Sequence, residues 1–464
     1  MQNTTKNYQH TATLLYFLIP IICHLPQIAG EGASRIAITL IILALTTPFL
    51  ILKSAGSIQQ TKLISRIFGD IATLKGNNTK YTLIYIAACI SAEMRGIYSE
   101  QSKPFSFVGL FALLSICYVV GYICFAMTST ERQRLRLVQA FSAGACTYIL
   151  LNIAGWALGV HGNTWQDAVM NAGDNSILAS IGISAPRVAF PFAAGLNHFS
   201  IFSGIATVIA LQTIMITISN WGKFIIAIEI AIGTTGLILS DSRGAIIMTV
   251  IAIALSALVK RKFIAKKTFI SLFFASSLLP FAAPPVIDFL NSTSLITSLS
   301  RDGAASRNLG VASGRDVIWS EGVKGVFSKP ESALIGFGTY GQVTSGAERN
   351  YSWIFGSTPG TGQATVHNAP LQILLDMGLI GLISWFFLWK EIGTGIDTVS
   401  KFGSYSTQCM ILSCGIFLYL MSFTEVSCTP YIIDSLMLLL LLSGSLQGFL
   451  RQADKTTNTI KINE

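Results

Sequence analysis

Two arginines and one histidine of this 464-residue chain stand where a helix is predicted to begin. Ser242 can cap a helix that carries Arg243 in its first turn, and Ser313 can cap one that carries Arg315 there. A cation in the first turn opposes the helix macrodipole, and an anion bound beside the free N–H groups would resolve that conflict. His367 directly precedes a third helix start, where a neutral imidazole can act as a general base. The chemistry indicated is binding of an anion such as phosphate beside a proton acceptor.

Each of these positions also has a simpler interpretation. Arg243 can snorkel to a membrane edge, and Arg315 can be a solvated arginine on a surface helix. His367 can be no more than an interfacial hydrogen-bonding group. Arg187, in a separate loop, can join the same anionic site or remain solvated. The residue types alone therefore do not decide between these interpretations, and the structural elements around each side chain have to be considered.

The segment around Arg315 has the pattern of a short amphipathic helix on the protein surface. Ser313 and Asp316 are three residues apart, which fits a capping box. Pro330 is expected to end this helix. Its apolar face, at helical spacing, would consist of Trp319, Val323 and Val326.

The helix that follows His367 has its own start signals. Asn368 can cap it through the side-chain oxygen, and Pro370 suits the first turn because it lacks an N–H group. His367 would then lie just outside the helix, at the membrane surface.

The chain as a whole is too apolar for a soluble protein. Hydrophobic residues make up 52% of the sequence and charged residues only 11%, less than half of the roughly 25% usual in soluble domains. We predict an all-α polytopic membrane protein, with residues 1–464 in one membrane domain. A span needs about 20 apolar residues, and we predict about twelve: 12–30, 36–52, 81–97, 105–127, 137–159, 196–217, 224–240, 244–259, 269–287, 370–389, 409–425 and 432–450.

The basic residues predict which loops face the cytoplasm. With the N-terminus inside, the cytoplasmic segments hold 20 of the 31 basic residues but only six of the 22 acidic ones. The net charge of +9 therefore indicates topology and contact with anionic lipid headgroups, not binding of nucleic acid. Both termini would be cytoplasmic, with residues 451–464 as a tail. Two outer loops would result, 160–195 and 288–369, and the larger would carry short amphipathic helices.

Several common site types lack their motifs in the sequence. There is no Asp-x-Asp or Asp-Asp pair of the kind that holds a divalent ion in many sugar transferases, so we predict no metal and no cofactor. A Walker motif and Cys-x-x-Cys pairs are also absent, and the cysteines are interpreted as small core residues.

Polar side chains in or near the predicted spans are costly in a bilayer. Asn197 and His198 are expected to be satisfied polar groups, and Glu93 can pair with Arg95. Three further acidic residues remain without an assigned role: Glu229, Asp376 and Glu425.

Five short motifs follow one another along the chain: Ser242-Arg243-Gly244, Ser313-Gly314-Arg315, Leu334-Ile335-Gly336-Phe337-Gly338, His367-Asn368 and Gly378-Leu379-Ile380-Gly381-Leu382. In this order they resemble the O-antigen ligase family, most strongly over residues 187–390. The resemblance implies a bacterial inner-membrane glycosyltransferase of the GT-C type with a metal-independent periplasmic site. The two arginines and the histidine of the family correspond to Arg243, Arg315 and His367, and Asp376 stands where many relatives have Glu.

The resemblance implies inverting transfer of a glycan from undecaprenyl pyrophosphate to a hydroxyl group of lipid A–core. Arg243 and Arg315, with Arg187, would bind the pyrophosphate, and His367 would take the proton of the acceptor. An O-antigen polymerase or a protein O-oligosaccharyltransferase would use the same donor, and the motifs do not separate these activities. A multi-pass transporter or flippase is the alternative from another class, although no pair of similar halves is visible. The bilayer is the expected environment, and no soluble protein partner is indicated.

Overall fold

The structure, a computed structural model, describes most of the predicted spans and part of both predicted outer loops. The predictions for the span at 36–52, for Arg187 and for Ser313 lie outside the described residues. The described residues are 2–22, 65, 69–74, 76–96, 104–160, 175–179, 181–184, 188, 190–193, 195–260, 264–291, 314–355, 364–401 and 405–463.

Long α-helices form a bundle, because an apolar segment in a bilayer must satisfy its backbone groups internally. Each predicted span other than 36–52 corresponds to one of these helices, and seven helices in the described part are long and apolar enough to cross a membrane. The all-α polytopic prediction is confirmed. The bundle consists of α1 (Gln2–Ile22), α5 (Asn77–Arg95), α6 (Pro104–Ala126), α7 (Glu131–Ala157), α10 (Leu196–Ile214), α11 (Asn220–Leu239), α12 (Arg243–Lys260), α13 (Ala265–Asn291), α17 (Ala369–Ser400), α18 (Tyr405–Met421) and α19 (Ile433–Asn463).

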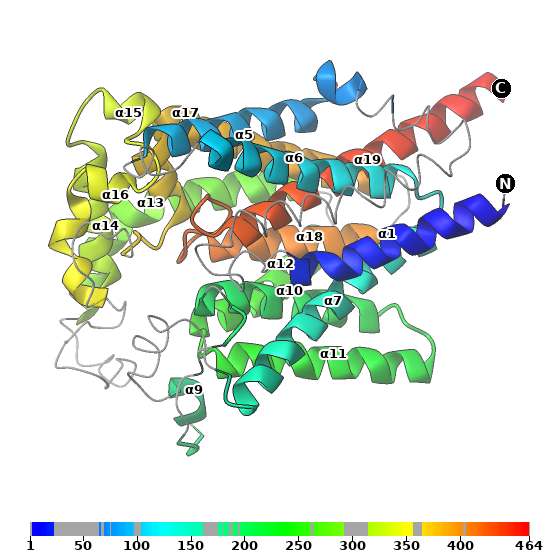
Figure 1. The fold of residues 1–464 in the computed structure, drawn as a ribbon, viewed down its shortest axis with the longest axis horizontal. Helices are drawn as coiled ribbons and strands as arrows, with labels where there is room; N and C mark the ends of the chain where they lie inside the picture. The colour runs from blue at the N-terminus through cyan, green and yellow to red at the C-terminus, as the bar shows by residue number, and fades with distance from the viewer. Residues whose placement is uncertain are drawn as a thin grey trace.

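A layer of short helices covers one end of the bundle, opposite the end where both termini lie (Figure 1). We call it the short-helix layer and the end it covers the covered end. It comes from the predicted loop 288–369, and α14 is the short helix expected there. Another short helix, α9 (Ser176–Ala179), follows α7. The layer comprises α14 (Arg315–Val326), α15 (Ser332–Ile335), α16 (Gly341–Thr344), η2 (Ala347–Asn350) and η3 (Ser352–Phe355).

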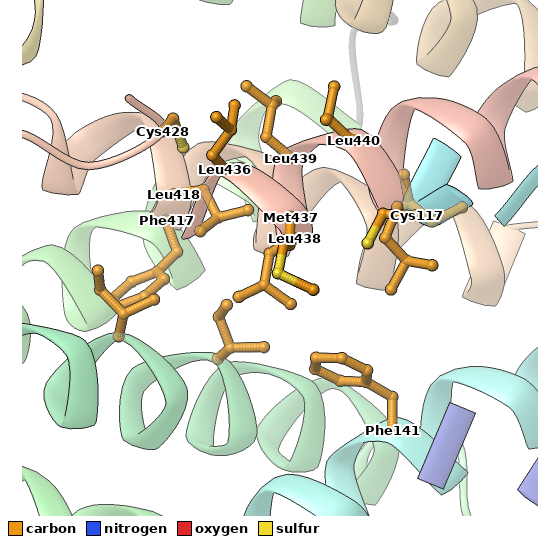
Figure 2. Packing of buried hydrophobic residues seen from close by; sticks show 14 of the residues in the cluster. Cys117, Phe141, Phe417, Leu418, Cys428, Leu436, Met437, Leu438, Leu439 and Leu440 are labelled. Atoms are coloured by element: carbon orange, nitrogen blue, oxygen red, sulfur yellow. The ribbon is translucent and has the colours of Figure 1, made fainter. Parts of the chain in front are cut away.

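Two separate hydrophobic cores stabilise the two layers. Figure 2 shows part of the larger core, where leucines of α19 pack with Phe141 of α7 and Phe417 of α18. The smaller core joins Trp319 and Val326 of α14 to Tyr351 and to the first turns of α17. All but one of the described cysteines are buried, and all of these cysteines are free, which confirms their interpretation as core residues.

α17 is broken at Gly378, whose φ of 63° and ψ of −160° lie outside the helical region. A Cβ atom at this position would approach the backbone of Leu334 and Gly336 to less than 3.0 Å, so a glycine is required for this packing. The break also frees carbonyl groups that the short-helix layer uses as acceptors. These bonds run from the Phe337 amide to the Leu375 carbonyl at 2.7 Å and from the Gly338 amide to the Asp376 carbonyl at 2.9 Å.

The break divides α17 into two parts with different surroundings. In residues 369–377, Ile373 and Met377 belong to the bundle core, whereas Leu371 and Leu375 belong to the core of the short-helix layer. This part therefore lies between the two layers, and residues 379–400 continue as a bundle helix.

Candidate active site

His367 lies immediately before α17, and the hydrogen bonds of Asn368 fix the backbone there. Asn368 is the N-cap, as predicted, and its side-chain oxygen accepts a hydrogen bond from the Leu371 amide at 2.9 Å. Its side-chain amide donates to the carbonyls of Ser276 and Phe423, each at 3.2 Å. His367 itself has a φ of 48°, which is uncommon for a residue other than glycine. The position of the imidazole is thus set by α13, α17 and the segment after α18.

α14 supports the segment before His367 from the other side. Trp319 is buried, and its indole N–H donates to the carbonyl of Val366 at 3.0 Å. Val326 is buried too and Val323 partly so, which confirms the predicted apolar face.

The predicted capping box at the start of α14 is wrong. Gly314, in a left-handed conformation with φ 79°, is the N-cap, and no side-chain cap hydrogen bond is present. Because the helix starts one residue later than expected, Asp316 falls at its second position and not its third. The helix also ends earlier, at Val326 and not at Pro330.

Glu425, in the segment between α18 and α19, contacts three side chains from other parts of the chain. Its Oε2 lies 3.0 Å from Nδ1 of His367 and accepts a hydrogen bond from the side-chain amide of Asn197 at 2.6 Å. Its Oε1 lies 3.5 Å from a terminal guanidinium nitrogen of Arg315. The residue is only 8% exposed, and a buried carboxylate is stable only when it is paired in this way.

The contact with Glu425 determines which nitrogen of His367 can act as a base. An ionised carboxylate only accepts hydrogen bonds, so a neutral imidazole bound to it carries its proton on Nδ1. Nε2 then carries the lone pair of the ring and can accept a proton. A carboxylate that orients a histidine in this way is the usual arrangement for a general base.

Arg243 and Arg315 begin two helices that converge on Thr424. The Arg315 guanidinium donates to the carbonyl of Thr424 at 3.3 Å. Arg243 is exposed and is the first residue of α12, as predicted. A Cβ atom built on the next residue, Gly244, would lie 3.6 Å from Oγ1 of Thr424. The Arg315 side chain thus contacts the residue beside Glu425, and the start of α12, which carries Arg243, lies at the same residue.

The turn before Arg243 is held by the segment at α9. Asp241 is buried with φ 49°, and its carboxylate accepts a hydrogen bond from the Ile177 amide at 3.3 Å. The side chain of Asn175 donates to the carbonyl of Ile238 at 2.9 Å. These contacts fix the direction in which α12 starts.

A second histidine–carboxylate pair lies next to the first. His198 Nδ1 is 2.9 Å from Oδ2 of Asp434, which is fully buried in the first turn of α19. The preceding residue, Asn197, contacts Glu425, so the first turn of α10 links both pairs. The expectation that Asn197 and His198 are satisfied polar groups is confirmed.

A buried polar network connects the first part of α17 to α16. The side-chain amide of Gln372 donates to Asp376 at 3.0 Å and to Gln342 at 2.8 Å, and Asp376 accepts from the Gly341 amide at 2.8 Å. The Tyr431 hydroxyl donates to Gln342 at 2.8 Å. Burial raises the pKa of this hydroxyl well above its ordinary value, so it stays protonated. Asp376 thus joins two helices beneath the site.

The pair expected between Glu93 and Arg95 is not formed. Glu93 accepts a hydrogen bond from the hydroxyl of Thr339 at 2.7 Å, and Arg95 donates to the carbonyls of Ile335 and Gly336 at 2.7 and 2.8 Å. Both side chains at the end of α5 therefore bind the short-helix layer, Glu93 through a hydroxyl group and Arg95 through two backbone carbonyls.

Glu425 is the residue of the site to which the sequence alone assigned no role. A signal was present, because an acidic residue at the end of a span is costly unless it is paired. Its partners could not be identified, since they lie 58 to 228 positions away in the chain. Glu229, another of the three unassigned acids, is not among the contacts of this cluster and accepts a hydrogen bond from Ser142 at 2.8 Å.

The charges of the site are those of guanidinium, imidazole and carboxylate groups. Among the residues that the structure describes, no group of three or more His, Cys, Asp or Glu side chains is placed to hold a metal ion. The positive charge at the starts of α12 and α14 comes from Arg243 and Arg315.

Fold and site together define a polytopic helical membrane protein with an arginine- and histidine-containing site at one end of its bundle. Residues 228–386 match the family model described as O-Antigen ligase. This segment, which carries Arg243, Arg315 and His367, belongs to the O-antigen ligase family. The match begins within α11 and ends within α17, so Glu425 lies beyond it. A comparison with curated proteins gives no match to the chain.

Proposed function

We propose that the protein is an O-antigen ligase, which transfers a glycan from undecaprenyl pyrophosphate to a hydroxyl group of lipid A–core. The observation that carries the proposal is the contact of His367 with Glu425, whose other oxygen lies 3.5 Å from Arg315. This cluster combines a proton acceptor with positive charge suited to a pyrophosphate. The family match over residues 228–386 supports a ligase- or polymerase-type activity.

In this proposal the arginines bind the pyrophosphate of the donor. Planar guanidinium groups can form paired hydrogen bonds to phosphate oxygens, and they keep their charge at any physiological pH. Arg243 and Arg315 would stabilise the negative charge that grows on the phosphate as the glycosidic bond breaks. Arg187 is proposed as a third phosphate-binding residue. The guanidinium groups thus do the work that a divalent ion does in many other sugar transferases.

The bond changes of the proposed reaction balance without a further reactant. Nε2 of His367 takes the proton of the acceptor hydroxyl, and the acceptor oxygen forms a bond to the anomeric carbon. The bond from that carbon to the phosphate oxygen breaks, and its electron pair stays on the phosphate. Attack opposite the leaving group inverts the anomeric centre. Glu425 stabilises the imidazolium that forms on His367.

The proposed setting is the bacterial inner membrane, with the site on the periplasmic face and both termini in the cytoplasm. Two observations support this orientation. The site lies at the covered end, opposite both termini (Figure 1). Basic residues concentrate in the segments that the orientation makes cytoplasmic.

The test is a reaction with purified protein, lipid-linked glycan and lipid A–core, run with and without the acceptor. A ligase attaches glycan to the core, and His367→Ala abolishes that product. His10→Ala is the matched control, since His10 is exposed on α1 and is not part of the cluster of His367, Glu425 and Arg315. Glycan that lengthens in the absence of core would show a polymerase instead. Glycan transferred to an added polypeptide would show a protein O-oligosaccharyltransferase.

A further inference from the structure

Five large, exposed apolar side chains lie together at the covered end of the bundle. They are 45 to 57% exposed, and they come from two elements that are far apart in the sequence. α15 lies beside α17 in Figure 1, and the backbone of Leu334 packs directly on the break at Gly378. We call this set the apolar patch, and it consists of Leu334, Ile335, Leu379, Ile380 and Ile383.

The α17 members of the patch begin a membrane-crossing helix. Residues 379–400 are about 33 Å long at a rise of about 1.5 Å per residue, which matches a hydrocarbon core of roughly 30 Å. α5, which ends at Arg95, is about 28 Å long by the same rise, and Arg95 contacts α15. Two helices thus place the level of α15 at the edge of the hydrocarbon.

The N–H groups of the irregular backbone beside α15 are satisfied by protein. In a bilayer, irregular backbone is tolerated where its polar groups are buried in protein. Residues 336–339 meet this requirement at all four N–H groups and at the carbonyl of Gly336. Their amides donate to the carbonyls of Ser332, Leu375, Asp376 and Ala92, and Arg95 donates to the carbonyls of Ile335 and Gly336.

The charged residues just before α15 also fit a position of this helix at the edge of the hydrocarbon. Lys329 and Glu331 are exposed and precede Leu334 by five and three residues. Charged groups at that distance can reach the headgroups while the following apolar side chains lie in hydrocarbon.

We infer that α15 and the first turns of residues 379–400 form one lipid-contacting surface, with residues 332–339 at the edge of the hydrocarbon and not in water. The partner is the acyl chains of bilayer phospholipids. The expected loop 288–369 is therefore not entirely extramembrane. Because α15 is packed on the break of α17, this contact also holds residues 369–377, which lead back to His367, at a fixed height above the bilayer. This inference does not depend on the proposed function.

The test measures the depth of single labelled positions in lipid nanodiscs. Leu334→Cys carries an environment-sensitive fluorophore, which is quenched either by spin-labelled lipid or by aqueous iodide. Leu379→Cys is the membrane reference, and Arg349→Cys, exposed on η2, is the aqueous reference. The unsubstituted protein, labelled in parallel, gives the background of the native cysteines.

We expect the label at Leu334 to emit at shorter wavelength than the label at Arg349 and to be quenched by spin-labelled lipid as at Leu379. Ile335→Cys is a second variant should Leu334→Cys fail to fold, and the same result is expected there. Quenching by iodide as strong as at Arg349, with none by spin-labelled lipid, would overturn the inference. Label depth and glycan transfer are separate measurements, so either proposal can fail without the other.

Discussion

Nδ1 of His367 and Oε2 of Glu425 lie 3.0 Å apart, although 58 residues separate them in the chain. The histidine precedes α17 and the carboxylate follows α18, so the contact exists only because these two helices pack with their ends together. The Ala369 amide donates to the carbonyl of Ser422 at 2.9 Å, which fixes the two ends against each other. The geometry of the base is therefore a property of the bundle and not of one loop.

Glu425→Gln should slow glycan transfer while the protein stays folded. An amide can present its NH₂ group to Nδ1, which favours the imidazole tautomer whose proton is on the wrong nitrogen. We expect kcat to fall by about 10²- to 10⁴-fold, the range for loss of general-base catalysis, with little change in KM. Initial rates and the apparent Tm in detergent measure the two effects.

The matched control for Glu425→Gln is Glu321→Gln. Glu321 lies on α14, where its carboxylate accepts a hydrogen bond from Lys324 at 2.6 Å on an exposed surface. That hydrogen bond lowers the pKa of the Glu321 carboxyl. Both glutamates lie beside a cation, but only Glu425 contacts His367. Equal loss of activity in both variants would refute the specific role of Glu425.

Arg315→Lys should impair the reaction even though the charge is kept. Lysine lacks the planar fork of donors that can bind a phosphate and the carbonyl of Thr424 together. Loss of one hydrogen bond to a charged group corresponds to roughly 1.5–3 kcal/mol, so kcat/KM should fall about 10- to 100-fold. Arg349→Lys, in the same layer but exposed, should have wild-type rates. Wild-type kcat/KM for Arg315→Lys would exclude a phosphate-binding role that needs the guanidinium group.

The bundle helices could be predicted from the sequence because a bilayer requires long apolar segments with few charges. The break in α17 could not. Gly378 is one of 40 glycines, and nothing local shows that the backbone of Leu334 packs on it. The sequence motif around Gly336 and the motif around Gly378 are two sides of one contact, which explains why both are rich in glycine.

The site was predictable only in part, for a similar reason. Helix starts are encoded locally, so Arg243, Arg315, His367 and the cap Asn368 could be found from short patterns. The partner Glu425 is defined by tertiary packing alone, since it is an acid at the end of a span like several others. α19 continues to Asn463 through most of the segment 451–464 that we predict as a cytoplasmic tail, and the sequence pattern alone does not show that this segment is helical.

Gly378→Ala should destabilise the protein more than a positive φ alone explains. Alanine at φ 63° and ψ −160° costs about 1–3 kcal/mol because that region is almost restricted to glycine, and the steric overlap with Leu334 and Gly336 should add about 1–3 kcal/mol. Gly346→Ala separates the two effects, because Gly346 has φ 81° but nothing within 4 Å of its Cβ position. The apparent Tm in detergent should fall clearly further for Gly378→Ala. Equal shifts would mean that the close packing of α15 on α17 contributes nothing.

Trp319→Phe tests whether α14 positions the base through the backbone. Phenylalanine keeps most of the apolar contact in the small core but cannot donate to the carbonyl of Val366, which is buried next to His367. An unsatisfied buried carbonyl costs about 1–3 kcal/mol, so the apparent Tm should fall. If the same bond also fixes His367, kcat should fall several-fold while KM changes little.

Trp353→Phe is the control that separates loss of an indole donor from loss of this particular bond. Trp353 also donates its indole N–H to a carbonyl, that of Asn350 at 3.0 Å, but it is half exposed on η3. Water can replace the donor there, so both Tm and kcat should stay near wild type. A fall of Tm without a fall of kcat in Trp319→Phe would assign Trp319 to stability alone. A fall of kcat in Trp319→Phe but not in Trp353→Phe would show that the hydrogen bond from α14 to Val366 positions His367.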